Sequence, residues 1–112
     1  MKFTLRKYVL ANGRIPFDDW LDELSPVMRA RVHSNLVRIE VGNFGNAKAI
    51  QGEDAKGLFE LRMFFGPGYR AYFGKDGDSL VLLLCGGDKK TQRRDISEAK
   101  KLWKEFKTRK AV

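Results

Sequence analysis

The sequence predicts a single α+β domain, residues 1–112, built on a small, largely antiparallel sheet. Its length of 112 residues is that of one common domain. Strand-like segments and segments of helical periodicity follow one another in the order β, α, α, β, β, β, α. Two glycine-containing turn sequences separate the three consecutive strands, as in a β-meander. The hydrophobic share of 43% and the charged share of 32% are those of a soluble globular protein.

The first strand is expected within residues 3–10, a segment rich in aromatic and branched side chains. Asn12-Gly13 follows it and supplies the positive φ of a turn. From Pro16 the period becomes helical, with an apolar stripe opposite an acidic one. The apolar stripe consists of Phe17, Trp20, Leu21 and Leu24. This pattern predicts a short helix after the strand.

A second helix is expected from Pro26 to about Val41. Ser25 is a good N-cap, and proline is favoured at the first helical position. Gly42-Asn43 is a typical helix end. The buried stripe is expected at Met28, Val32, Leu36 and Ile39. Two helices joined by so tight a turn predict an αα-hairpin.

Residues 42–57 contain four glycines and little periodicity, so they are expected to form a loop. The three meander strands are expected at residues 58–65, 69–74 and 79–86. The last strand is apolar on both faces and is therefore expected to be central in the sheet. A C-terminal helix follows, with Thr91 or Asp95 as its N-cap. Its apolar stripe consists of Ile96, Ala99, Leu102, Trp103 and Phe106.

The net charge of +8 arises from 22 Lys and Arg against 14 Asp and Glu. Residues 88–112 hold ten basic and four acidic side chains, so most of the excess lies at the C-terminal end. Such an excess of positive charge favours nucleic acid, an anionic surface or an acidic protein as a partner. The lysine-rich run within residues 100–110 fits either a solvated helix face or polyanion binding.

Few residues suit metal or cofactor binding. His33 is the only histidine and Cys85 the only cysteine, so we expect no cofactor and no His/Cys metal site. Cys85 lies in an apolar run and is expected to be inert. The acidic residues at helical spacing fit a solvated helix face; they are Asp18, Asp19, Asp22 and Glu23. Since no membrane span and no signal peptide are expected, a cytoplasmic protein that binds no membrane is predicted.

Charged and apolar residues alternate along the first meander strand, which places Glu60 and Arg62 together on one open face. If Gly66-Pro67-Gly68 is a three-residue loop, Arg62 opposes Tyr72 and lies diagonal to Arg70. Two guanidinium groups and a phenol then converge. Such a pair binds phosphate well, because each planar guanidinium can donate two parallel hydrogen bonds. In the alternative, Glu60 and Arg62 only screen one another on a solvated sheet.

Gly86-Gly87 leads from the last strand towards the C-terminal helix. Such a joint can present backbone N–H groups to an anion. Lys89 and Lys90 beside it can bind phosphate or, when desolvated among other cations, transfer protons. The glycine pair also fits a joint that needs small residues for steric reasons alone.

Three sequence blocks together are typical of one superfamily. They are Glu60-Leu61-Arg62, Gly68-Tyr69-Arg70 and CGGDKKTQ at residues 85–92, the last followed by Asp95-Ile96 and a helix with Ala99-Lys100. With the element order, they make nearly the whole chain resemble the RelE/HigB/ParE toxin superfamily. The likeness is greatest to the branch of addiction-module killer or phage-derived Gp49-like proteins. The resemblance implies a RelE-like fold.

The resemblance further implies the toxin of a type II toxin–antitoxin pair, which a cognate antitoxin holds inactive. Such a toxin is a metal-independent endoribonuclease that cleaves mRNA on the ribosome. The RNA 2′-hydroxyl attacks the adjacent phosphate, which needs a base, an acid and cations. By this resemblance Arg70 binds the scissile phosphate, and Arg62 and either Lys89 or Lys90 are further basic residues of the site.

The C-terminal helix departs from the superfamily pattern. Many RelE members have a catalytic tyrosine near this end and HigB members have histidines, whereas Trp103 and Phe106 occupy the helix here. The general acid is therefore unassigned, and Glu60 or Tyr72 is expected to transfer protons. Two alternatives stay open: a ParE-like inhibitor of DNA gyrase, and a basic module that only binds nucleic acid. The oligomeric state is open as well.

Overall fold

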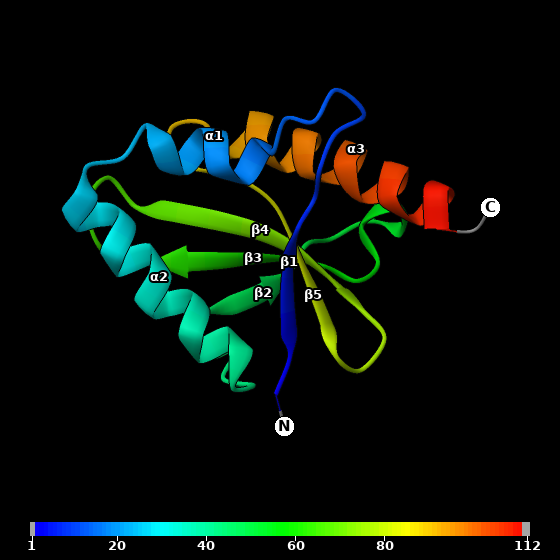
Figure 1. The fold of residues 1–112 in the computed structure, drawn as a ribbon, viewed down its shortest axis with the longest axis horizontal. Coiled ribbons are helices and arrows are strands. Elements are labelled where there is room, and N and C mark those ends of the chain that lie inside the picture. Colours follow the sequence, from blue (N-terminus) through cyan, green and yellow to red (C-terminus); the bar gives the residue numbers. More distant parts are fainter. Residues whose placement is uncertain (1, 111–112) are drawn as a thin grey trace.

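The computed structural model describes residues 2–110. Its elements are β1 (Thr4–Lys7), α1 (Pro16–Asp22), α2 (Pro26–Glu40), β2 (Ala47–Ala49), the 3-10 helix η1 (Glu53–Ala55), β3 (Leu58–Met63), β4 (Tyr69–Asp76), β5 (Leu80–Gly87) and α3 (Gln92–Lys110). The five strands form one sheet in the order β1-β5-β4-β3-β2 (Figure 1). β1 pairs with β5 in parallel, and the other three pairings are antiparallel. The predicted α+β fold is confirmed.

Helices cover both faces of the sheet. α1 and α2 form the predicted αα-hairpin, and their buried side chains pack on one face in what we call the hairpin core. The hairpin core includes Phe17, Trp20, Val32, Leu36, Ile39, Leu61 and Phe73. α3 packs on the other face in a second cluster, the α3 core. The α3 core includes Leu58, Tyr72, Leu82, Leu84, Ala99, Leu102 and Trp103.

β5 contributes to both cores, as its apolar run predicts. Val81 and Leu83 belong to the hairpin core, whereas Leu82 and Leu84 belong to the α3 core. The strand lies between β1 and β4, which confirms its central position. Its register against β4 shifts between Tyr72 and Phe73, where a bulge interrupts the ladder.

The helix ends follow the predicted signals. The Ser25 side chain accepts a hydrogen bond from the Met28 N–H at 3.2 Å, so Ser25 caps α2 as expected. α3 begins at Gln92, directly after Thr91. The alternative N-cap, Asp95, lies inside the first turn of α3 and is therefore wrong as a cap. Within residues 2–110, no helix is both long enough and apolar enough to cross a membrane.

Two details of the middle of the chain differ from the prediction. The expected loop at residues 42–57 contains β2 and η1, because even a short segment can pair with the edge of β3. The β3–β4 loop is also longer than three residues: Arg62 pairs with Arg70, and Glu60 pairs with Tyr72. The turn starts at Phe65, whose carbonyl accepts from the Gly68 N–H at 3.3 Å.

Two strand glycines make room for the two tryptophans, one on each face of the sheet. A Cβ at Gly74 would collide with the ring of Trp103 in the α3 core. A Cβ at Gly86 would collide with the ring of Trp20 in the hairpin core. In each helix layer, therefore, an indole ring packs closely against the sheet over a glycine.

Candidate active site

Glu60 is buried, although the alternation in β3 predicts an open face. Only 5% of the residue is exposed. The start of α3 crosses this end of the sheet, and Gln92 Nε2 donates a hydrogen bond to Glu60 Oε2 at 2.8 Å. The expectation of an open face is therefore wrong at Glu60.

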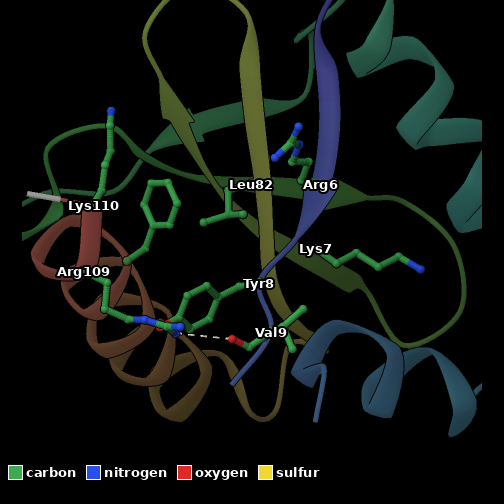
Figure 2. Close-up of a pocket in the computed structure, with 8 residues that line it drawn as sticks. Arg6, Lys7, Tyr8, Val9, Leu82, Arg109 and Lys110 are labelled. Atoms are coloured by element: carbon green, nitrogen blue, oxygen red, sulfur yellow. Dashed lines mark hydrogen bonds between the residues drawn. The ribbon is translucent and has the colours of Figure 1, made fainter. Parts of the chain in front are cut away.

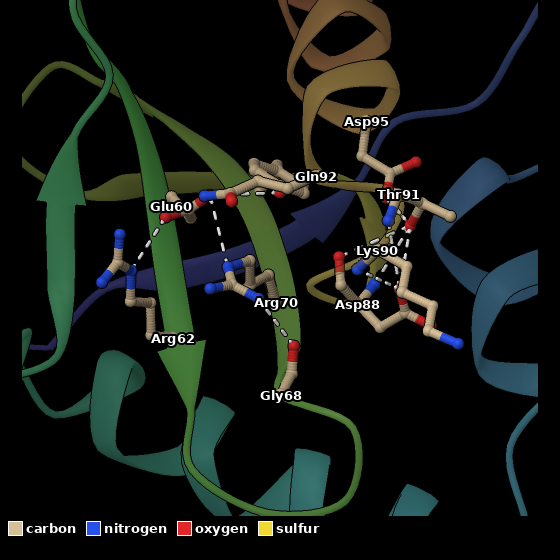
Figure 3. A network of polar contacts seen from close by, with 10 residues as sticks. Glu60, Arg62, Gly68, Arg70, Asp88, Lys90, Thr91, Gln92 and Asp95 are labelled. Atoms are coloured by element: carbon tan, nitrogen blue, oxygen red, sulfur yellow. Dashed lines mark hydrogen bonds and ion pairs between the residues drawn. The ribbon is translucent and has the colours of Figure 1, made fainter.

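The Glu60 carboxylate is the centre of a polar network that three elements build (Figure 3). Arg62 Nε donates to Oε1 at 3.1 Å. The Tyr72 hydroxyl donates to Oε2 at 3.1 Å, beside Gln92. Three donors from β3, β4 and α3 thus fix the orientation of one buried carboxylate, which compensates for the cost of its burial.

Arg70 lies beside this carboxylate and is only partly satisfied. The residue is 8% exposed. Its Nη1 donates to the Gly68 carbonyl at 2.9 Å. Its Nε lies 3.7 Å from Glu60 Oε2, which is an ion pair but too long for a hydrogen bond. Among the described residues, Arg70 Nε is the one buried side-chain nitrogen or oxygen without a hydrogen-bond partner.

The two arginines come together more directly than predicted. Arg62 and Arg70 are cross-strand partners rather than diagonal neighbours, so their side chains lie side by side on one face of the sheet. The Arg62 side chain is 37% exposed, whereas that of Arg70 is 10% exposed. An anion approaching from solvent would meet Arg62 first, because the Arg70 side chain is largely enclosed.

Tyr72 is fully buried beneath Glu60. Burial raises the pKa of its phenol far above the ordinary value, and the adjacent Glu60 charge and hydrogen bond raise it further. The phenol therefore stays protonated at neutral pH, and its O–H donates a hydrogen bond to the Glu60 carboxylate.

The joint between β5 and α3 uses its donors internally. Asp88 Oδ1 accepts from the Lys90 N–H at 2.9 Å and from the Thr91 N–H at 3.2 Å. Thr91 Oγ1 donates to the buried Asp95 carboxylate. A Cβ at Gly87 would collide with that carboxylate. The backbone donors of this joint thus bind an internal carboxylate, and Gly87 gives the Asp95 side chain its space.

The two lysines of the joint lie differently. A Cβ at Gly68 would stand 3.6 Å from the Lys89 Cβ and 3.5 Å from Arg70 Nη1, so Lys89 and Arg70 both flank Gly68. Lys90 is exposed and extends away from the Arg70 side chain (Figure 3). Of the two lysines, Lys89 is the one that shares Gly68 as a neighbour with Arg70.

The structure therefore brings together five of the residues named from the sequence and adds a sixth, Gln92. The gathered residues are Glu60, Arg62, Arg70, Tyr72 and Lys89. Gln92 belongs to the CGGDKKTQ block, but nothing in the sequence pattern assigned it a role. Its position was a usable signal. Gln92 lies in the first turn of α3, and α3 follows β5, the strand that pairs with β4.

A separate basic hollow of about 440 Å³ lies between β1 and the end of α3 (Figure 2). Three of its four basic side chains are engaged: Lys7 pairs with Asp18, Lys110 pairs with Asp76, and Arg109 donates to the Tyr8 hydroxyl. Among the described residues, the fourth, Arg6, has no carboxylate within 4.0 Å. Within residues 2–110, no group of three His, Cys, Asp or Glu side chains is arranged to hold a metal ion. The Glu60–Arg70 network is therefore the candidate active site.

Comparison with known proteins gives matches of three kinds: to a family, to a protein sequence and to solved structures. The family described as "Phage derived protein Gp49-like" matches residues 19–107. An uncharacterized protein of Haemophilus influenzae is 42% identical over 93 residues, which cover 82% of this chain and 90% of that protein. A chain in the crystal structure of the toxin–antitoxin complex RelBE2 from Mycobacterium tuberculosis superposes with a TM-score of 0.53 at 21% identity, covering 80% of this chain and 100% of that chain. This last likeness shows the fold. The protein thus has a RelE-like fold and belongs to the phage-derived Gp49-like family.

Proposed function

We propose that this protein is the toxin of a toxin–antitoxin pair and that it cleaves mRNA on the ribosome. The observation that carries the proposal is the cross-strand pair of Arg62 and Arg70 beside the buried Glu60 carboxylate. Guanidinium groups bind phosphodiesters well, and the exposed side chain of Arg62 offers the first contact. The RelE-like fold and the family membership support the same function.

The chemistry proposed is attack of the RNA 2′-hydroxyl on its own 3′-phosphate. The 2′-oxygen bonds to phosphorus, the bond to the 5′-oxygen breaks, and a 2′,3′-cyclic phosphate and a 5′-hydroxyl result. Negative charge builds up on the phosphoryl oxygens in the transition state. Arg62 and Arg70 stabilise it, because guanidinium groups stay charged and are already fixed in position.

Two proton transfers complete the step. We assign the 2′-hydroxyl proton to the Glu60 carboxylate, which Tyr72 and Gln92 hold in position. Tyr72 keeps its own proton and is a positioning residue. Lys89, which flanks Gly68 together with Arg70, is assigned to protonate the leaving 5′-oxygen.

The proposed partner is a cognate antitoxin that covers this site. The net charge of +8 favours a partner segment rich in Asp and Glu. The structural relative from Mycobacterium tuberculosis was itself crystallised as a toxin–antitoxin complex, which supports the proposal.

Induction in bacteria tests the function. The wild type should arrest growth, and primer extension on an abundant message should show new 5′ ends within minutes. Arg70→Ala should give no new ends, while Arg14→Ala, a surface arginine paired with Asp19, should behave as wild type. Growth arrest without new ends would contradict the nuclease and indicate a gyrase inhibitor. The absence of any arrest would indicate a module that only binds nucleic acid.

A further inference from the structure

Phe64 is an aromatic side chain without a structural role in the fold. It is 79% exposed, more than any other large hydrophobic residue among residues 2–110. It follows the last residue of β3 and precedes the β3–β4 turn, so neither core uses its ring. An exposed aromatic ring of this kind is a platform on which an unpaired base can stack.

Phe64 lines a hollow of about 310 Å³ between α2 and the end of β3. Figure 1 shows β3 ending beside α2. The lining is aromatic, amide and guanidinium in character, with Arg31, Asn35, Arg38, Asn46, Phe64 and Phe65. The volume is at the lower end of the range for small-molecule sites, which suits a single base.

The polar groups of the hollow are available to a ligand. Among the described residues, neither Arg31 nor Arg38 has a carboxylate within 4.0 Å. The Arg31 guanidinium carbon lies 4.3 Å from the centre of the Phe65 ring, within the range of a cation–π contact. Asn35 Nδ2 donates to the Arg31 carbonyl at 2.9 Å, which leaves Asn35 Oδ1 as an acceptor. Amide groups and arginine planes recognise base edges and faces.

The hollow lies close to the arginine pair along the chain, at the end of β3 and on the side of the sheet that α2 covers. Phe64 follows Arg62 by two residues, about 7 Å along an extended strand, which is the scale of one nucleotide step. The Arg62 N–H donates to the Asn46 carbonyl at 3.1 Å, so the backbone of one lining residue is bonded to the backbone of Arg62. An RNA strand with one phosphate on Arg62 and Arg70 would bring a neighbouring base to Phe64.

We infer that this hollow binds one nucleobase of the RNA substrate, with Phe64 as the stacking platform, and so contributes to sequence preference. The inference rests on the proposed function. A protein partner is the competing occupant, because α2 also exposes Val27, Val37 and Val41. Those valines do not line the hollow, whose arginine, amide and aromatic groups suit a base better.

Binding of an uncleavable RNA tests the inference apart from catalysis. The probe is a short single strand with 2′-O-methyl groups throughout, and fluorescence anisotropy measures its affinity for the purified chain. Phe64→Ala should weaken binding about 5- to 150-fold, the range that alanine substitution gives for base stacking. Phe64→Tyr should bind within about two-fold of wild type, since it keeps the ring. Val9→Ala, at another exposed apolar residue, is the matched control.

Abasic nucleotides placed one at a time along the probe locate the contact. At one position, the abasic nucleotide should weaken binding to the wild type but not to Phe64→Ala. In that variant the contact between the base and the Phe64 ring is already lost, so removing the base has no further effect. Equal affinity of wild type and Phe64→Ala for the intact probe would overturn the inference and indicate that Phe64 contacts a protein. If the wild type binds RNA with this pattern but cleaves no mRNA, the base-binding site stands and the proposed nuclease activity is contradicted.

Discussion

The two faces of the sheet are covered by helices in different ways. On the hairpin face, α1 and α2 enclose a core of apolar side chains with no buried charge among its members. On the α3 face, the apolar core around Trp103 gives way at the start of α3 to buried Glu60, Arg70 and Asp95. Burying the charges of the α3 face costs more free energy, because each buried charge loses its hydration and needs partners in the protein. The face that retains such a cluster is the one where function is expected.

The largest effect is expected at the polar end of the α3 face. Arg70→Ala should lower the rate of mRNA cleavage about 100- to 1000-fold, as the loss of one transition-state donor does. The variant should still fold, at a reduced free energy of unfolding, because Arg70 is buried but Glu60 keeps its bonds to Arg62, Tyr72 and Gln92. Single-turnover cleavage and urea unfolding measure the two effects. A protein that fails to fold would show that Arg70 is structural.

The next effect tests whether the apolar parts of the two faces are equivalent. Gly74→Ala and Gly86→Ala each drive a methyl group into an indole ring, of Trp103 and Trp20 respectively. Each should lower the free energy of unfolding by about 3 kcal/mol. Urea unfolding of both variants gives the comparison. A large effect at one glycine with none at the other would mean that only one helix layer is tightly seated.

Tyr72→Phe removes a hydroxyl that only the polar network uses. It should lower the free energy of unfolding by about 1.5 kcal/mol, since two other donors to Glu60 remain. The folded protein raises the pKa of Tyr72 above its ordinary value of 10.0. The stabilisation is therefore complete below pH 10.0 and is lost as the pH rises beyond it, because only the unfolded chain then releases the proton. Unfolding of both proteins between pH 8 and about pH 11 measures this, and a difference that grows with pH would contradict it.

The last comparison separates two neighbouring lysines. Lys89 flanks Gly68 together with Arg70, whereas Lys90 extends away from Arg70. Lys89→Ala should slow cleavage by about 100-fold if the lysine is the proton donor, and Lys90→Ala should alter it by less than two-fold. Both should change stability by no more than about 0.5 kcal/mol, since both side chains are exposed. Equal rates in the two variants would remove Lys89 from the proposed step.

The sequence predicts most of the fold because its local signals agree with its packing. Ser25-Pro26 marks the start of α2, and the apolar run of β5 marks a central strand. The β3–β4 register was wrong because Phe64 and Phe65 read as a continued strand, and nothing local indicates that the turn begins at Phe65. The error was two residues, so it kept Arg62 and Arg70 on one face.

The site was only partly predictable, because burial depends on distant elements. Alternation in β3 places Glu60 and Arg62 correctly on one face, but it carries no information about what covers that face. Gln92 reaches Glu60 from 32 positions away in the chain. Only the packing of α3 decides that the carboxylate is enclosed and that Tyr72 holds its proton.

The central claim is that the polar end of the α3 face performs cleavage in addition to its part in the packing of the fold. A purified translation system with a defined mRNA, with and without ribosomes, tests it most directly when wild type is compared with Arg70→Lys. Lysine keeps the charge but loses the planar group that binds phosphate at two points. The account predicts cleavage on ribosomes by the wild type, at least about 10-fold slower cleavage by Arg70→Lys, and similar unfolding curves. Equal cleavage by the two proteins, or no cleavage by the wild type under either condition, would contradict it.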